Sequence, residues 1–260
     1  MKTKQKLMLL VSIVFSIACK KESSNLSQEM NAASQQSIAA TNQSALTVNP
    51  ADFVNVIDNP YFPLEPGTTR KYVEKIKENG TTTIANTTVV VTRKIKVILS
   101  VTCAVIHDQV TEKEKVVEDT YDWYAQDKHG NVWYFGEATR ALTDTGWSTI
   151  GSWEAGVNGA KAGIIMYGHP GRHIGETYYQ EFYKGYAEDQ ATLLSNNSTV
   201  IIGLGTFTHC VETKEFTRLD PKAVTKKIYA PGIGEILAVD LPRGTAKEQL
   251  VSFERNRYAN

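Results

Sequence analysis

The strongest constraint on the fold is an alternation of apolar and polar residues that recurs in short segments between turn signals. In residues 88–97 the apolar members are Val89, Val91, Ile95 and Val97, and the polar members are Thr88, Thr92, Lys94 and Lys96. A strand buried on one side needs this period of two. Residues 70–78 are also strand-like and lead into Asn79-Gly80, a strong hairpin signal, so the return strand is expected after Thr81.

The same pattern continues over the rest of the chain. Further strands are expected at 100–110, 121–126, 132–137, 176–183, 187–195, 198–207, 209–216, 228–230, 235–239 and 249–254. A short helix is expected only near Pro50–Ile57. About ten closely spaced strands predict an all-β, mainly antiparallel fold, either a half-open or closed β-barrel or a β-sandwich.

Residues 140–175 are rich in glycine and form one long irregular excursion in this prediction. Loops of this length in a compact domain commonly act as lids or binding loops. We therefore expect the excursion to cover a concave sheet face.

The first residues have the composition of an export signal. Three lysines lie within the first six residues, and an apolar run follows from Leu7 to Ala18. A run this short matches a secretory signal peptide over residues 1–18 better than a membrane span. The run ends in Ser16-Ile17-Ala18-Cys19, which resembles the lipobox of bacterial lipoproteins. The resemblance implies that Cys19 becomes the N-terminus and carries acyl chains such as palmitate, which anchor it in a membrane. An ordinary signal peptide is the alternative.

A tether is expected between this anchor and the folded part. Residues 22–48 contain 15 Ser, Thr, Asn or Gln among 27 residues and no aromatic residue, so they cannot bury enough apolar surface to fold. The expected organisation is a signal peptide at 1–18, lipidated Cys19 with a disordered tether at 19–48, and one β-rich domain at 49–260. Under the sorting rules that the lipobox implies, Lys20 favours the outer membrane over the inner one, facing the periplasm or the surface.

Charge argues against nucleic acid as a partner. Lys and Arg together number 28, and so do Asp and Glu, so the chain has no basic surplus for phosphate. No Gly-x-Ser-x-Gly elbow and no phosphate-binding Gly-x4-Gly-Lys loop occurs, and no cofactor is predicted. His169 and His173 have a spacing that binds metal on a helix, but Pro170 and its flanking glycines oppose a helix, so no metal is predicted.

Two cysteines remain after Cys19. In an oxidising compartment Cys103 and Cys210 could form a disulfide. The alternative is two buried free thiols in separate strands.

Several segments share motifs with other exported proteins. They are Asn59-Pro60-Tyr61-Phe62-Pro63-Leu64-Glu65-Pro66-Gly67-Thr68, Asp122-Trp123-Tyr124-Ala125-Gln126-Asp127 and Gly130-Asn131-Val132-Trp133-Tyr134-Phe135-Gly136-Glu137. This pattern resembles an uncharacterised family of bacterial exported lipoproteins. The resemblance implies a β domain and transfers no catalytic residue. At the level of fold, the strands also resemble the half-barrels of lipoprotein carriers, which hold acyl chains on a curved sheet.

Aromatic and acidic residues gather in the predicted hairpin at 121–137. Alternation places Asp122 and Tyr124 on one face of the first strand, and places Glu137 with Trp133 opposite Tyr134 on the second. Acids beside aromatics are typical of small-molecule and sugar sites. The alternative is that the aromatics fill the core and the acids face water.

Two more candidates lie farther along the chain, namely the pair Trp153-Glu154 and Glu181. The candidate ligand-binding residues are therefore Trp123, Tyr124, Trp133, Tyr134, Trp153, Glu154 and Glu181. The sequence favours a lipid-anchored protein that binds a small molecule, lipid or glycan, or that is structural in the envelope. The alternative is a surface hydrolase of carbohydrate or ester in which Glu154 and Glu181 serve as acid and base. Oligomeric state is not predicted.

Overall fold

The computed structural model describes residues 47–78, 80–241 and 246–255. The predicted signal peptide, Cys19 and nearly all of the tether lie outside the described residues, as does Asn79 of the predicted hairpin turn. Within the described ranges, no helix combines the length and hydropathy needed to cross a membrane.

Strands dominate the described part of the chain, which contains sixteen strands and two short 3-10 turns. The strands are β1 (Phe53–Val54), β2 (Thr68–Glu78), β3 (Thr81–Ile98), β4 (Val101–Glu112), β5 (Lys115–Asp127), β6 (Val132–Thr143), β7 (Gly146–Ser148), β8 (Trp153–Glu154), β9 (Lys161–Met166), β10 (Thr177–Tyr179), β11 (Glu181–Phe182), β12 (Asp189–Ile202), β13 (Gly205–Thr217), β14 (Val224–Ala230), β15 (Gly234–Asp240) and β16 (Ala246–Arg255). The 3-10 turns are η1 (Pro50–Asp52) and η2 (Pro170–Arg172). The pairings between these strands are antiparallel, which confirms the predicted fold class.

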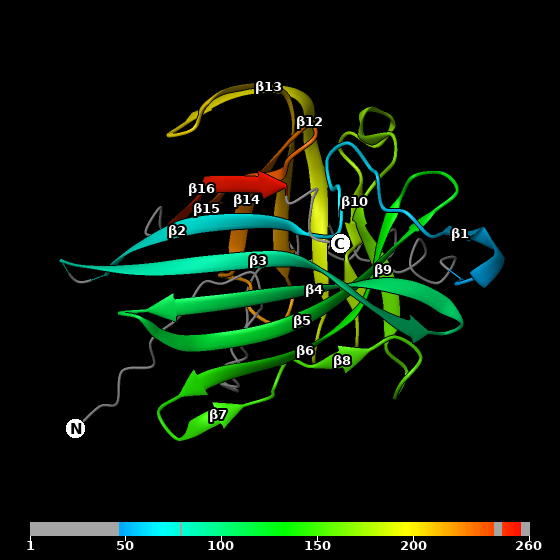
Figure 1. Cartoon of the computed structure of the whole chain (residues 1–260), viewed down its shortest axis with the longest axis horizontal. Coiled ribbons are helices and arrows are strands. Elements are labelled where there is room, and N and C mark those ends of the chain that lie inside the picture. The colour runs from blue at the N-terminus through cyan, green and yellow to red at the C-terminus, as the bar shows by residue number, and fades with distance from the viewer. Residues whose placement is uncertain (1–46, 79, 242–245, 256–260) are drawn as a thin grey trace, which may run out of the picture.

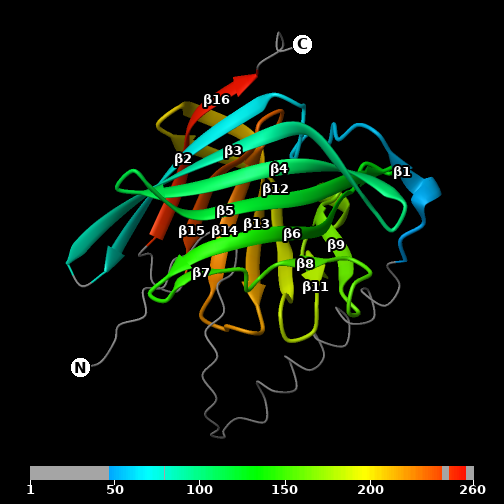
Figure 2. The ribbon, with the colours of Figure 1, turned by 60° about the horizontal axis from the view of Figure 1, so that its bottom comes forward.

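The strands form a nearly closed barrel. Their order along the wall is β10-β12-β13-β14-β15-β16-β2-β3-β4-β5-β6-β9-β11. The two end strands, β10 and β11, are separated in the chain by the single residue Gln180, so one kink brings the two edges of the sheet together. Figure 1 shows β2–β6 crossing in front of β12–β15, and Figure 2 shows the same two halves enclosing an interior. The barrel prediction is thereby confirmed over the sandwich.

The glycine-rich segment at 140–175 is partly built into the wall. β6 continues to Thr143, and the short strands β7 and β8 pair with it. β9 pairs with both β6 and β11 and so forms part of the barrel wall. At the N-terminal side, the expected helix near 50–57 amounts to the three-residue turn η1.

Two strand predictions need correction. We expected a break between 195 and 198, but one strand, β12, runs through it, and the turn follows at Gly203-Leu204. The Asn-rich stretch forms bulges, because the register shifts three times between Leu193 and Val200. In β3, a register shift between Val91 and Ile95 interrupts the alternation, so Ile95 and Val97 are 68% and 62% exposed, contrary to their predicted burial.

The largest cluster of buried apolar residues includes side chains on both faces of the wall, and Leu64, Ile106 and Tyr229 belong to it and line the interior. Other members lie on the outer face. Trp123, Trp133 and Phe135 are buried there with Cys103, and Phe53 of β1 packs edge-on against Trp133. A smaller buried cluster, including Ile236 and Leu250, lies on β2 and β12–β16. Apolar packing on the outer face accompanies an interior that mixes apolar, aromatic and charged side chains.

Candidate functional site

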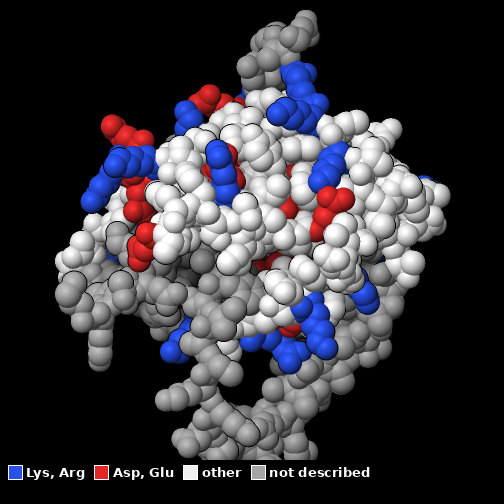
Figure 3. All heavy atoms as spheres, turned by 90° about the horizontal axis from the view of Figure 1, so that it is seen from below, with Lys and Arg blue, Asp and Glu red and all other residues white. Residues whose placement is uncertain are grey.

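The barrel interior contains a cavity of about 130 Å³. Side chains from strands on every side of the barrel line it, together with Phe62, Pro63 and Leu64 from the segment before β2. An enclosed apolar cavity of about 150 Å³ holds one benzene molecule, so the space suits a ligand with a single ring or a short chain. Seen from below, acidic side chains show inside hollows of the surface (Figure 3).

Acidic groups dominate the lining. Among the described residues, the acidic side chains at the cavity are Asp108, Asp122, Glu137, Glu181, Asp189, Glu215, Glu235 and Glu248, and the basic ones are Arg70 and Lys227. Carboxyl groups are seldom buried unless they are paired, because the charged form loses its hydration. An interior of this composition therefore needs an account of how each group is compensated.

On one side of the cavity, the acids are compensated by a buried ammonium group. Lys227 Nζ lies 3.2 Å from Glu215 Oε2 and 3.5 Å from Glu235 Oε2, and the Tyr229 hydroxyl donates to Glu215 Oε1 at 2.9 Å. Burial alone would lower the pKa of Lys227, but the two carboxylates outweigh it and raise that pKa. Burial raises the pKa of Glu235 to about 7, and Lys227 opposes the rise.

Arg70 has a different role. Its Nε donates to the carbonyl of Ile233 at 2.7 Å, and its Nη2 donates to the carbonyl of Pro63 at 2.6 Å. No described carboxylate lies within ion-pair distance of its guanidinium group. Arg70 therefore ties the segment before β2 to the β14–β15 turn, and its charge acts on Glu235 without forming an ion pair.

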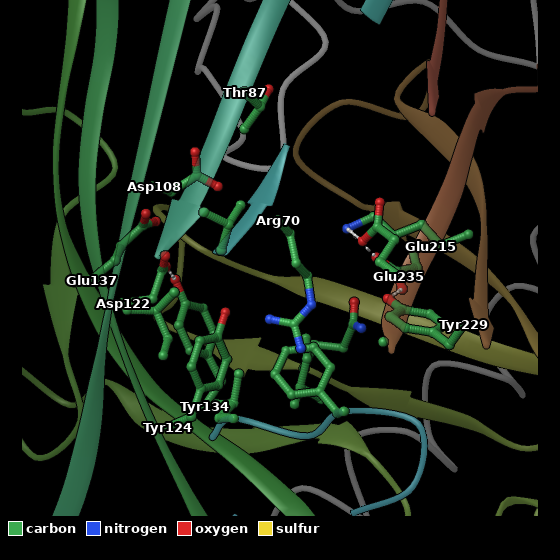
Figure 4. Close-up of a pocket in the computed structure, with 18 of the residues that line it drawn as sticks. Arg70, Thr87, Asp108, Asp122, Tyr124, Tyr134, Glu137, Glu215, Tyr229 and Glu235 are labelled. Carbon is green, nitrogen blue, oxygen red and sulfur yellow. Dashed lines mark hydrogen bonds and ion pairs between the residues drawn. The ribbon is translucent and has the colours of Figure 1, made fainter. Parts of the chain in front are cut away.

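On the opposite side, Asp108, Asp122 and Glu137 form what we call the acid wall, on β4, β5 and β6 (Figure 4). Asp122 and Glu137 are direct cross-strand partners, which places their Cβ atoms about 5 Å apart. The Tyr134 hydroxyl donates to Asp122 Oδ1 at 2.6 Å. Glu137 is only 7% exposed, and its Oε2 has no hydrogen-bond partner among the described residues. Within the described chain, no Lys, Arg or His forms an ion pair with this wall.

Burial sets the protonation of the acid wall. It raises the pKa of Asp122 to about 6, against the opposing effect of the Tyr134 hydrogen bond. Burial and the nearby Asp122 carboxyl together raise the pKa of Glu137 well above its ordinary value, and they do the same for Asp108. The acid wall therefore retains its protons to higher pH than free carboxyl groups do.

A bulge places Glu137 in this wall. The register shifts where Trp123 pairs with Gly136 and Tyr124 pairs with Tyr134, so Glu137 faces the cavity together with Tyr134. The predicted opposite placement of these two residues was wrong, because the period of two does not hold across the bulge. Gly136 has φ +129°, and a Cβ there would clash with the Trp153 carbonyl oxygen, so the bulge depends on glycine.

Gln180 adds a second unpartnered group. This residue joins β10 to β11, lines the cavity and is 3% exposed. Its Nε2 has no hydrogen-bond partner in the described part of the chain. The neighbouring Glu181 also faces the cavity, and its pKa is raised well above the ordinary value by burial and by Asp189. Trp153 Nε1 lies near this carboxyl and slightly opposes the rise, without completing a hydrogen bond.

The structure divides the sequence-predicted residues between two locations. Tyr124, Tyr134 and Glu181 line the cavity, and the two tyrosine rings stack at 4.8 Å. Trp153 lies behind them, edge-on to Tyr134 at 5.3 Å. Trp123 and Trp133 lie in the outer core. Lys96 Nζ covers the Trp123 ring at 3.3 Å, and Trp133 Nε1 donates to Asp127 at 2.9 Å.

Glu154 is not part of the cavity lining. It forms an ion pair with Lys96 at 2.7 Å and is half-buried. The structure therefore does not bring Glu154 and Glu181 together across the cavity.

Several lining residues were not proposed from the sequence as site residues. They are Arg70, Asp108, Asp122, Glu137, Asp189, Glu215, Lys227, Glu235 and Glu248. The sequence signal for them was weak, because single charged residues on strands, such as Glu248 between Ala246 and Leu250 on one face, usually point to water.

The remaining candidates have structural environments. Cys103 and Cys210 are buried free thiols, with five strands between them in the sheet order. His173 stacks on Tyr167 at 3.8 Å and contacts Glu176 at 2.9 Å. Across the residues that the structure describes, no three His, Cys, Asp or Glu side chains converge closely enough to ligate a metal ion.

Comparison with known proteins identifies two distant structural similarities. No protein-family model matches the sequence, and no curated protein matches it. A structure from Bacteroides fragilis, described as a candidate exported protein with a YmcC-like fold, is 13% identical, with a TM-score of 0.44 over 78% of this chain and 100% of that one. A candidate lipoprotein from Parabacteroides distasonis is 9% identical, with a TM-score of 0.36 over 75% of this chain and 99% of that one.

Proposed function

We propose that this protein is a lipid-anchored envelope protein that binds a small polar molecule inside its barrel. The observation that carries the proposal is a pair of buried polar atoms at the cavity, Glu137 Oε2 and Gln180 Nε2, that, like Asp189 Oδ1, have no partner among the described residues. An unsatisfied buried polar group costs about 1–3 kcal/mol. A ligand that offers both a donor and an acceptor would satisfy these two atoms.

The lining favours a polar ligand over an acyl chain. Burying the carboxyl groups of the cavity against hydrocarbon would remove their water without giving them a hydrogen-bond partner. The cavity nevertheless has apolar faces, since Phe62, Tyr124 and Tyr229 contribute rings that contact one another at 5.2 Å and 6.4 Å. Polar groups beside aromatic faces suit a small molecule with a polar end and an apolar body.

The hydrolase alternative receives less support from the geometry. An acid and a base must both reach the same substrate. Glu181 lines the cavity, whereas Glu154 is paired with Lys96 away from it. We therefore propose binding rather than turnover.

A cavity-filling variant tests the proposal. Native mass spectrometry of the full-length protein, purified from membranes in detergent, should detect a small molecule that Ile106→Trp abolishes, because Ile106 lines the cavity. Ile95→Trp is the matched control, since Ile95 is an exposed isoleucine on the neighbouring strand β3. Gln180→Leu serves as a second variant should Ile106→Trp fail to fold by circular dichroism. Retention of the molecule by both cavity variants would refute the proposed site.

The anchor rests on the sequence alone, because Cys19 lies outside the described residues. We expect the wild-type protein to carry acyl chains and to enter the detergent phase on phase separation. Cys19→Ala should remain unacylated by mass spectrometry. Acylation that persists in this variant would contradict the assignment of Cys19.

A further inference from the structure

We infer that the ligand is a small organic cation, a primary amine or amidine on an apolar body, whose charged end binds to the acid wall of Asp108, Asp122 and Glu137. This inference rests on the proposed function and narrows its ligand class.

The described basic side chains of the interior do not form ion pairs with the acid wall. Of the two basic side chains at the cavity, Lys227 forms ion pairs with Glu215 and Glu235, and Arg70 donates hydrogen bonds to backbone carbonyl groups. Among the described residues, neither is paired with the acid wall. Three acids on adjacent strands therefore line the cavity without an ion pair to any described Lys, Arg or His, and Arg70 lies across the cavity from them (Figure 4). A positively charged ligand would supply the missing charge.

The carboxyl groups of the acid wall are placed to accept hydrogen bonds from a charged nitrogen group. Glu137 Oε2 is buried, faces the cavity and has no partner in the described chain. An ammonium or amidinium group carries several N–H donors and can contact Glu137 and its cross-strand partner Asp122 at once. The Gln180 amide, which is also buried and unpartnered, can bind a second polar atom of the ligand.

The barrel already holds one ammonium group, that of Lys227, between carboxylates. Lys227 Nζ lies between two carboxylates at 3.2 Å and 3.5 Å inside the same cavity lining. The acid wall presents a similar set of acids without a built-in lysine. Stacked Tyr124 and Tyr134 beside it provide the aromatic faces on which cations and rings bind.

The described acids do not favour a metal ion as this cation. No three of them converge closely enough to ligate one. The cavity of about 130 Å³ instead suits a body of one ring.

Proton release should accompany binding. Other titratable groups that act on Asp122 or Glu137 are Asp108, Glu118, Tyr134, Glu181, Asp189 and Lys227. Most of these are acids, so a cation favours ionisation of the wall and displaces a proton. With the pKa of Asp122 at about 6, its ionised fraction rises about tenfold between pH 5 and pH 7. Binding of the cation should strengthen by the same factor.

The experiment compares three probes of the same size by isothermal titration calorimetry. Benzylamine is the cation, benzyl alcohol is the neutral isostere and benzoate is the anion. The full-length protein in detergent is titrated at pH 5 and pH 7, in buffers of different ionisation enthalpy, so that released protons are counted. Asp122→Asn is the test variant, Glu137→Gln replaces it if folding fails, and Glu154→Gln is the control outside the cavity.

We expect benzylamine alone to bind well, about tenfold more tightly at pH 7 than at pH 5, with release of a proton. Asp122→Asn should weaken it at least tenfold and abolish the pH dependence, while Glu154→Gln should change neither. If benzyl alcohol or benzoate binds at least as tightly as benzylamine and Ile106→Trp abolishes that binding, the preference for a cation is refuted. The proposed function as a small-molecule binder then still stands. No binding of any probe, together with no bound molecule in native mass spectrometry, would refute both.

Discussion

Replacing Glu74 with Gln should remove a specific part of the pH dependence of folding. Glu74 lies on β2 directly opposite Glu248 of β16 and is 3% exposed. Burial and the nearby Glu248 carboxyl raise the pKa of Glu74 from 4.5 to about 8. Between these values the folded protein keeps a proton that the unfolded chain has released. Stability from this group is therefore present at low pH and is lost as pH rises from 4.5 towards 8.

The two pKa values give the size of the effect. Ionisation of this carboxyl stabilises the unfolded state by about 0.8 kcal/mol at pH 5 and about 3.4 kcal/mol at pH 7. The folded state gains almost nothing from ionisation at these pH values, because the pKa of Glu74 in the folded protein is about 8. Wild-type protein should therefore lose about 2.5 kcal/mol more stability than Glu74→Gln between pH 5 and pH 7.

Urea denaturation followed by tryptophan fluorescence at pH 5, 6 and 7 measures this difference directly. The two proteins are compared by how their free energy of unfolding changes with pH, because the substitution also changes that free energy by a pH-independent amount. Glu114→Gln, in the exposed turn between β4 and β5, is the control and should follow the wild type. Parallel loss of stability in wild type and Glu74→Gln would refute the reasoning, since it would mean that Glu74 is ionised inside the barrel.

Three further predictions follow from the interior and its support. Lys227→Met should destabilise the fold by about 3–5 kcal/mol in urea denaturation, because it leaves two buried carboxylates without their cation; a neutral effect would show that water already solvates them. Gly136→Ala should cost about 2 kcal/mol or more, since the new Cβ meets the Trp153 carbonyl at φ +129°; a wild-type melting temperature would refute the requirement for glycine at the bulge. Cys103 and Cys210 should both react with a thiol reagent only after denaturation without reductant, because they are buried and unpaired; a mass two daltons lower with no reactive thiol would instead show a disulfide.

The local rules of strand pairing predicted much of the fold. The β2–β3 hairpin forms where alternation and the turn signal indicated it, and β14 and β15 pair with each other at the predicted strand positions. Alternation also placed Asp122 and Tyr124 on one face, and both line the cavity. These features depend only on neighbouring residues, so one sequence is enough to indicate them.

Features that depend on distant contacts could not be predicted in this way. Glu137 joins the acid wall through a bulge, and that bulge requires Gly136 to lie against β8. The closure of the barrel depends on the kink at Gln180, where the first and last strands of the sheet order meet. Alternation divides a strand into two faces, but only closure decides which face becomes the interior.

This decision is unusual here, and it links the fold to the proposed function. A common barrel buries apolar side chains inside and exposes polar ones, so Trp123 and Trp133 were natural candidates for a pocket. In this protein they pack on the outer face of the wall, while eight acids line the cavity beside aromatic and apolar side chains. Protonation and the ion pairs with Lys227 lower the free-energy cost of burying those acids. The same burial makes the unpaired carboxyls strong partners for a cation, because their attraction is little screened inside the barrel. The groups that weaken the fold are thus the ones best placed to bind a ligand.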